Sequence, residues 1–236
     1  MKVITGCVIC MKNASKEFNS TGESTSVKFY PADMDNNGIV HLKCDNGHNT
    51  AGILIGSKHQ FLFESGCRAL IDTYANEAVS SFSAALERTY EFFIRVACRK
   101  LGLTSDLIES TWKNVKSQSE RQFGAFLFLY PTITGESFKL QNEIPEFRNK
   151  VIHKGYIARS EEVLDYAEKI FFLIRQIVAV LNDKCSNEMW EEINEGIEVQ
   201  KKVIPSNMEW TYLSVTPFDL RKDLTFESWV DELKTT

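Results

Sequence analysis

Residues 75–101 read ANEAVSSFSAALERTYEFFIRVACRKL, and this stretch decides the fold class. Its large apolar side chains recur at steps of three and four residues, at Val79, Phe82, Leu86, Tyr90, Phe93 and Ala97. A helix with 3.6 residues per turn places such positions on one face, so we predict one long amphipathic helix that buries this face. Gly102 follows directly and favours the end of the helix there.

The chain downstream keeps the helical pattern. Thr104 or Ser105 can cap a helix, Pro145 suits the first turn of another, and Ser160 can cap the longest apolar stripe, from Val163 to Leu181. The predicted helices are 104–117, 120–130, 145–154 and 160–183. We therefore expect residues 66–183 to form an up-and-down helical bundle in a mainly α protein.

The two ends of the chain differ from this bundle. Residues 1–64 contain a polar stretch, Asn13–Ser26, and short apolar or alternating runs separated by turn residues, which predict strands. The predicted strands are 27–30, 39–43, 51–55 and 60–63. We expect a small β-rich module over 1–64 and a C-terminal extension over 186–236, with helices at 187–202 and 226–233 and an extended segment at 210–215.

Two pairs of candidate metal ligands flank the predicted strands. Cys7 and Cys10 are separated by two residues, and Cys44 is followed four residues later by His48. In a zinc ribbon each pair lies on a tight turn, and the four side chains converge on one tetrahedral ion. We predict a structural Zn²⁺ in a zinc-ribbon-like module, with a closed shell that leaves no position for substrate. The alternative is unrelated thiols beside a surface histidine.

Composition excludes several classes of protein. The chain of 236 residues is 43% hydrophobic and 25% charged, which is typical of a globular protein, and charged or polar residues break its longest apolar runs. We expect no transmembrane helix, no secretory signal and a cytoplasmic location, where the six cysteines stay reduced. Phosphate-binding glycine loops, serine-hydrolase elbows and clusters of acidic metal ligands do not occur as motifs.

Charge is distributed unevenly. The net charge is −5, yet residues 186–236 alone carry −6, so the rest of the chain is close to neutral. A non-specific nucleic-acid binder would have a long basic stripe. Residues 143–160 carry a local excess of +2, and we expect any site for a polyanion to lie there.

That segment contains Arg148-Asn149-Lys150-Val151-Ile152-His153, followed by Gly155. It resembles the Arg-Asn-x-x-x-His signature of the HEPN superfamily, and the resemblance covers about 66–183. Its members are small helical bundles and often metal-independent endoribonucleases. The resemblance implies a homodimer with a shared site, RNA as substrate, a role as a toxin or anti-phage defence effector, and control by an antitoxin or sensor protein.

The side chains fit this chemistry. RNA cleavage by its own 2′-OH needs a proton acceptor and a group that stabilises the charge on phosphate. We expect Arg148, Asn149 and His153 to be catalytic, because an imidazole titrates near neutral pH and a guanidinium grips two phosphate oxygens. Lys150 and Lys154 are candidate RNA-binding residues. No cofactor is expected for catalysis.

One copy of the motif supplies only one imidazole, which favours a two-fold dimer, since acid and base catalysis together use two. Phe92, Phe93, Ile94, Phe171 and Phe172 give the bundle helices more apolar surface than one stripe needs, and we expect the dimer to bury part of it. Two alternatives remain. Arg148 and His153 can contact Glu143 or Glu146 in a helix that only packs the bundle, or the chain can be a non-catalytic nucleotide- or RNA-binding adaptor module.

Overall fold

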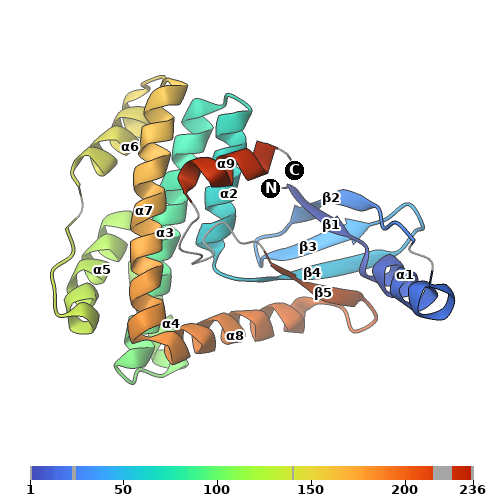
Figure 1. Cartoon of the computed structure of the whole chain (residues 1–236). Helices are drawn as coiled ribbons and strands as arrows, with labels where there is room; N and C mark the ends of the chain where they lie inside the picture. The colour runs from blue at the N-terminus through green and yellow to red at the C-terminus, as the bar shows by residue number, and fades with distance from the viewer. Residues whose placement is uncertain (1, 23–24, 140, 215–224, 235–236) are drawn as a thin grey trace. The chain divides into compact units, whose positions relative to one another are not determined.

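A computed structural model describes residues 2–22, 25–139, 141–214 and 225–234 (Figure 1). The chain divides into two compact units. The first, here called the sheet unit, comprises Met1–Gly56 and Ile193–Val215, and the second, the helical unit, comprises Ser57–Glu192 and Thr216–Thr236. Among the described residues, none of the helices combines the length and apolarity that crossing a membrane requires.

The sheet unit is built on a five-stranded sheet in the order β1-β2-β3-β4-β5. The strands are β1 (Lys2–Gly6), β2 (Phe29–Met34), β3 (Ile39–Lys43), β4 (Asn49–Ile55) and β5 (Glu209–Ser214). The first four pair antiparallel, whereas β5 lies parallel to β4, with Ile53 opposite Tyr212. Antiparallel neighbours can be joined by short turns, but a parallel pair needs a long connection. Here residues Ser57–Glu192 of the helical unit lie within that connection.

Strand β3 matches its predicted bounds, and β2, β4 and β5 lie within a few residues of theirs. The turn before β3 has a clear local cause. Asp35 Oδ1 accepts hydrogen bonds from the Asn37 and Ile39 backbone N–H groups at 2.8 and 3.0 Å, and Gly38 takes the left-handed conformation with φ 80°. The apolar side chains of Val40, Leu42, Ile53 and Leu54 are buried and form the core of the sheet.

In the first 64 residues one prediction is wrong, and strand β1 and helix α1 were not predicted from the sequence. Much of the polar stretch Asn13–Ser26 lies in helix α1 (Val8–Thr21), which ends at Gly22 with φ 75°. Residues 60–63 are not a strand but belong to α2 (Lys58–Ile71), the first helix of the helical unit. The run Phe61-Leu62-Phe63 fits a strand or a buried helix equally well by periodicity, and here it packs as a helix with Phe61 and Phe63 buried.

The helical unit is organised around α3 (Ala75–Lys100), which matches its predicted bounds within one residue. The other helices of this unit are α4 (Ser105–Val115), α5 (Ser119–Thr134), α6 (Glu143–Lys154), α7 (Ser160–Lys184) and α9 (Phe226–Lys234). Helix α3 packs against α2, α4, α5, α6 and α7. Helix α8 (Ser186–Val203) begins in the helical unit and ends in the sheet unit.

The ends of most of these helices follow the predicted signals. Helix α7 differs, because the predicted cap Ser160 is its first helical residue and its N-cap is Arg159. Thr104 caps α4 by accepting the Leu107 N–H, and α6 ends at Gly155 with φ 65°. Helix α5 was expected to stop before Pro131 but continues to Thr134 and ends at Gly135. The chain is thus mainly helical with a small sheet, but residues 186–236 are not a separate extension, because β5 joins the N-terminal strands and α9 packs in the helical unit.

The core of the helical unit is aromatic. Phe63 packs on Phe82 with ring centroids 4.9 Å apart, and Phe93 meets Phe126 edge to face at 5.0 Å. Five side chains were expected to supply a dimer surface. Four of them are buried within the chain and cannot form such a surface: Phe92, Phe93, Ile94 and Phe171. Phe172 is 55% exposed.

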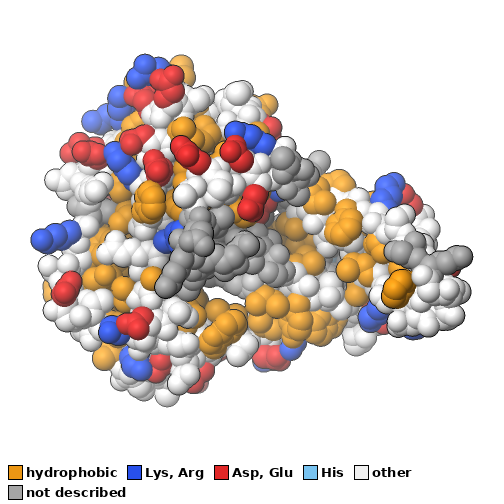
Figure 2. All heavy atoms as spheres, in the orientation of Figure 1, with side chains coloured by type: hydrophobic (Ala, Val, Ile, Leu, Met, Phe, Trp, Pro, Cys, Tyr) orange, Lys and Arg blue, Asp and Glu red, His pale blue; other side chains and the backbone are white. Residues whose placement is uncertain are grey.

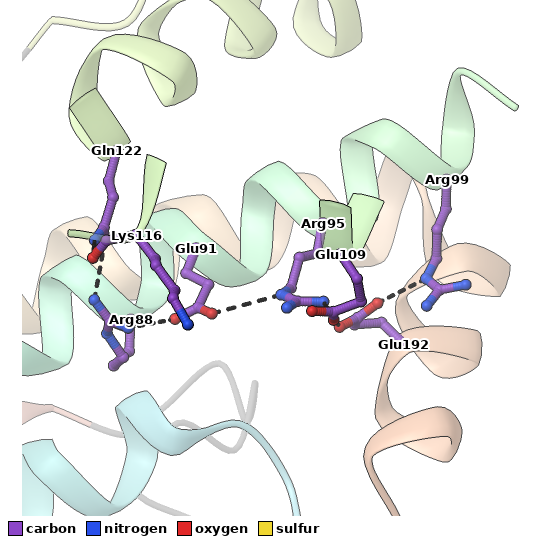
Figure 3. A network of polar contacts seen from close by, with 8 residues as sticks. All are labelled: Arg88, Glu91, Arg95, Arg99, Glu109, Lys116, Gln122 and Glu192. Atoms are coloured by element: carbon purple, nitrogen blue, oxygen red, sulfur yellow. Dashed lines mark hydrogen bonds and ion pairs between the residues drawn. The ribbon is translucent and has the colours of Figure 1, made fainter. Parts of the chain in front are cut away.

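A chain of ion pairs runs along α3 and holds α4 and α8 (Figure 3). Arg95 Nη1 lies 2.7 Å from Glu109 Oε1 on α4 and 3.4 Å from Glu192 Oε1 on α8. Arg99 Nε contacts Glu192 Oε2 at 2.7 Å. Desolvation of Arg95 is outweighed by its three carboxylate neighbours, so the pKa of this guanidinium is raised. These pairs fix the first half of α8 to the bundle.

Candidate functional site

The predicted metal ligands Cys7, Cys10, Cys44 and His48 form a cluster in the sheet unit whose ligand atoms all lie within 4.8 Å of one another. Cys10 Sγ lies 3.9 Å from Cys44 Sγ, and both sulfurs lie 3.5 Å from His48 Nδ1. Cys7 Sγ is 3.8 Å from the same nitrogen. The four residues could hold a metal ion.

The local backbone structure positions each of the two ligand pairs, Cys7 with Cys10 and Cys44 with His48. Cys7 directly follows β1 and is the N-cap of α1. Cys10 lies in the first turn of α1, and the Cys7 carbonyl accepts the Met11 N–H at 2.9 Å. Cys44 and His48 flank the turn between β3 and β4. The Gly47 N–H donates to the Cys44 carbonyl at 2.9 Å, and Gly47 has φ 77°, a conformation that favours glycine.

The geometry fits a tetrahedral ion. With metal–sulfur and metal–nitrogen bonds of about 2.3 and 2.0 Å, ligand atoms are expected about 3.8 Å apart for two sulfurs and about 3.5 Å apart for sulfur and nitrogen. The separations among Cys10, Cys44 and His48, 3.5–3.9 Å, agree with these values, and Cys7 Sγ is 3.8 Å from His48 Nδ1. Burial opposes ionisation of Cys44, but backbone N–H groups of His48 and Asn46 lower the pKa of its thiol to about 7, which favours the thiolate that a metal needs.

The setting of this cluster differs from the predicted zinc ribbon. A ribbon carries each ligand pair on a turn between strands, whereas here the first pair lies at the start of a helix. Asn46 Nδ2 also donates to Cys10 Sγ at 3.4 Å, a contact that the sequence did not indicate. Hydrogen bonds of this kind orient ligands and tune the metal.

The second candidate site lies on α6 in the helical unit. Arg148 Nη1 is 3.1 Å from both His153 Nε2 and Asn149 Oδ1, so the structure brings the three predicted catalytic side chains together. A guanidinium has no acceptor, and the shared hydrogen bond therefore runs from Arg148 to His153 Nε2. Asn149 and His153 are exposed and Arg148 is partly buried. The cluster is open to a large ligand.

Sequence analysis missed one member of this cluster. Glu87 on α3 accepts a hydrogen bond from Arg148 Nη2 at 3.4 Å, and both side chains are partly exposed, at 30% and 25%. In the alternative in which this helix only packs the bundle, the acidic partner was Glu143 or Glu146. Glu143 instead pairs with Lys169 on α7 at 2.8 Å. A glutamate 61 residues away on another helix gives no local signal in the sequence.

The turn after α6 is held by α3. Asn76 Nδ2 donates to the Tyr156 carbonyl at 3.1 Å, and Asn76 Oδ1 accepts the Ala158 N–H at 3.0 Å. The Lys150 ammonium lies 3.4 Å from the centre of the Tyr156 ring. Lys150 and Lys154 are exposed, as expected for residues that bind RNA, although Lys150 is turned toward the tyrosine.

Charge on the helical unit is mixed. Figure 2 shows acidic and basic side chains interspersed over the face of this unit that it presents. Comparison of the chain with known protein families, curated proteins and solved structures finds no match.

Proposed function

We propose that the chain is a metal-independent endoribonuclease of the HEPN type that cleaves single-stranded RNA through its own 2′-OH. The observation that carries the proposal is the Arg148 guanidinium, which lies 3.1 Å from both His153 Nε2 and Asn149 Oδ1 on an accessible surface. The Arg148 guanidinium and the His153 imidazole nitrogen therefore lie side by side. Phosphate binding requires the first of these groups, and proton transfer requires the second.

The mechanism follows from these atoms. A phosphate that binds Arg148 draws the guanidinium from His153, and Nε2 is then free to accept the 2′-OH proton. The 2′-oxygen bonds to phosphorus while the bond to the 5′-oxygen breaks. The products are a 2′,3′-cyclic phosphate and a 5′-hydroxyl, and Arg148 stabilises the charge on the five-coordinate phosphate.

The departing 5′-oxygen needs a proton, which a second imidazole can donate. We propose that this imidazole is His153 of a two-fold related copy. Exposed apolar side chains on the helical unit support an interface of this kind, since Ile157 is 82%, Phe172 55% and Leu164 46% exposed. Lys150 and Lys154 would then contact flanking phosphates.

We further propose that the Cys3His cluster of the sheet unit binds zinc in a structural role. Three thiolates and an imidazole are the donors that zinc prefers, and four protein ligands close its coordination shell. The ion would hold α1 against the turn between β3 and β4. It would not contact RNA.

The deciding experiment measures cleavage of a labelled single-stranded RNA in EDTA. We expect cleavage to persist, to leave 2′,3′-cyclic phosphate ends and to spare the matching DNA, which lacks the nucleophile. His153→Ala should lower the rate by about 10²–10⁴. Arg148→Lys keeps the positive charge but loses the planar guanidinium that can donate two hydrogen bonds to one phosphate. It therefore tests whether the geometry of the donor matters in addition to its charge. RNA cleavage that is unchanged in purified His153→Ala protein would refute the assignment.

Mixed dimers test the shared site. Pairing an Arg148→Ala chain with a His153→Ala chain leaves one intact copy of each side chain in the assembly. Partial activity that neither homodimer shows would support a composite site. An active monomer at micromolar concentration would contradict it.

A second candidate function is a non-catalytic nucleotide- or RNA-binding adaptor. The ion pair of Arg148 with Glu87 favours this function, because the Glu87 carboxylate already neutralises part of the guanidinium charge and uses one of its hydrogen-bond donors. In that case RNA would bind with salt-dependent affinity and remain intact.

As a cellular role we propose a toxin or anti-phage effector held in check by an antitoxin or sensor protein. Uncontrolled RNA cleavage would stop growth. Growth arrest on expression, relieved by His153→Ala at equal protein level, would support this role.

A further inference from the structure

A pocket of about 230 Å³ lies between α6 and α7, on the helical unit. Its apolar wall is formed by Ile144, Phe147 and Tyr166, and the Phe147 and Tyr166 rings lie 5.2 Å apart. The Tyr166 hydroxyl forms a hydrogen bond with Ser83 Oγ at 2.9 Å, so this tyrosine contributes its ring to the pocket rather than its oxygen. The two rings are tilted by 44° to each other, so a planar ligand can pack on one of them, Phe147.

The rim of the pocket has an ordered pattern of charge. The Lys169 ammonium lies between two carboxylates, 2.8 Å from Glu143 Oε2 and 2.9 Å from Asp165 Oδ2. Glu162, which also lines the pocket, accepts the Tyr156 hydroxyl at 3.0 Å. The rim therefore presents a hydrogen-bond donor beside strong acceptors.

This pocket adjoins the Arg148 cluster through the backbone of α6. Phe147 lines the pocket, and Arg148 is the next residue. Consecutive residues of a helix project about 100° apart, so a nucleotide whose phosphate binds Arg148 would pass around α6 to place its base on Phe147. The acidic rim would repel a phosphate group, so the neutral part of the nucleotide is the part that suits the pocket.

We propose that the pocket binds a guanine base of the RNA substrate and sets a preference for cleavage beside guanosine. This inference rests on the proposed endoribonuclease function. Guanine carries an acceptor, O6, beside two donors, N1–H and N2–H, on one edge. O6 would accept from Lys169, and the two donors would bind Asp165 or Glu143, while the ring packs on Phe147.

The other bases match less well. Adenine, cytosine and uracil each present a single donor group on that edge, so none of them can place two adjacent N–H groups on one carboxylate as guanine does. The position of Lys169 also disfavours a basic protein segment as the ligand. A second cation would have to displace the ammonium, whereas O6 accepts a hydrogen bond from it.

Two measurements on the full-length protein test the inference. Cleavage is mapped on an RNA that contains every dinucleotide, and binding is measured for 2′-O-methyl pentamers UUGUU, UUAUU, UUCUU and UUUUU, which lack the nucleophile. Wild type should prefer guanosine by about tenfold in both measurements. Asp165→Asn and Lys169→Met should each bring the ratio of guanosine to the other bases close to one. Glu168 is an exposed neighbouring residue on α7, and Glu168→Gln should leave this ratio unchanged.

The outcomes separate this inference from the proposed function. Cleavage without base preference would overturn the guanine pocket and leave the nuclease. Preferential binding of UUGUU without cleavage would keep the pocket and remove the nuclease. If an arginine-rich peptide binds wild type and loses affinity in Asp165→Asn while the pentamers do not, the pocket is a protein-binding site and the inference is wrong.

Discussion

Glu87 on α3 and Arg148 on α6 form an ion pair, with Glu87 Oε1 3.4 Å from Arg148 Nη2. The same guanidinium contacts His153 through its other terminal nitrogen. Glu87 therefore competes with any phosphate that approaches Arg148, and it also fixes the direction of the guanidinium.

Neutralising Glu87 tests this competition. Glu87→Gln keeps an acceptor for Arg148 but removes the charge, and we expect KM for RNA to fall about two- to fivefold, because a partly exposed pair contributes up to about 1 kcal/mol. Glu77→Gln, an exposed residue on the same helix, is the control. A KM that rises in Glu87→Gln alone would show that the carboxylate assists RNA binding.

Metal content is the second prediction. Purified protein should contain about one zinc ion per chain, and Cys44→Ser should lose the metal and destabilise the sheet unit, since metal binding and folding are linked. Cys98→Ser in the helical unit is the control and should keep the zinc. Elemental analysis and proteolysis of the two variants provide the readout. Wild-type protein purified with full recovery but without metal would contradict the assignment.

Low pH should release this metal. The folded pKa of Cys44 is about 7, below the usual value for a thiol, so its thiolate is available from near neutrality upward. Despite a hydrogen bond from Asn46, burial and the neighbouring Cys7 and Cys44 raise the pKa of the Cys10 thiol, so protons compete with the metal already above neutrality. Apparent metal affinity should therefore decrease steadily as pH falls. Zinc binding titrated between pH 5 and 8 measures this. Affinity that does not change over that range would be inconsistent with a thiolate site.

Two glycines in the helical unit should respond oppositely to alanine. A Cβ at Gly66 would meet the buried Phe82 ring at 2.7 Å, so Gly66→Ala should cost about 1–3 kcal/mol of unfolding free energy. Gly124 lies within α5 with open space around it, and Gly124→Ala should stabilise by about 0.5–1 kcal/mol. Chemical denaturation measures both. A neutral Gly66→Ala would mean that Phe82 moves at little cost.

The ion pairs of Figure 3 give the last prediction. Glu192→Ala leaves Arg95 and Arg99 without a shared partner, and we expect a loss of about 1–3 kcal/mol. Glu191→Ala, at an exposed neighbouring position, should change stability by less than about 0.5 kcal/mol. Equal effects of the two variants would show that the network contributes little.

The sequence predicts most of the helices because their signals are local. The stripe within α3, the Thr104 cap and Gly155 each lie inside or beside the element they define. The Cys and His ligands were found for the same reason, since each pair is close in sequence. Helix α1 was missed because only Val8 is buried in it, so its sequence carries little apolar periodicity.

Long-range partners could not be predicted. Nothing near Trp210 indicates that it pairs with Ala51, and nothing near Asn76 indicates that it holds Ala158. Such contacts depend on how elements pack after they form. The same applies to Glu87, whose role becomes visible only once α3 and α6 lie side by side.

The parallel strand β5 gives the chain an order of assembly. During synthesis, the ribosome makes β1 to β4 and the Cys3His cluster first, and all helices from α2 to α8 before β5. The β4 edge of the N-terminal strands therefore has no β5 partner while helices α2 to α8 are made and begin to fold. A bound metal would keep those strands together during this interval, so its largest effect is expected on the yield of newly made protein.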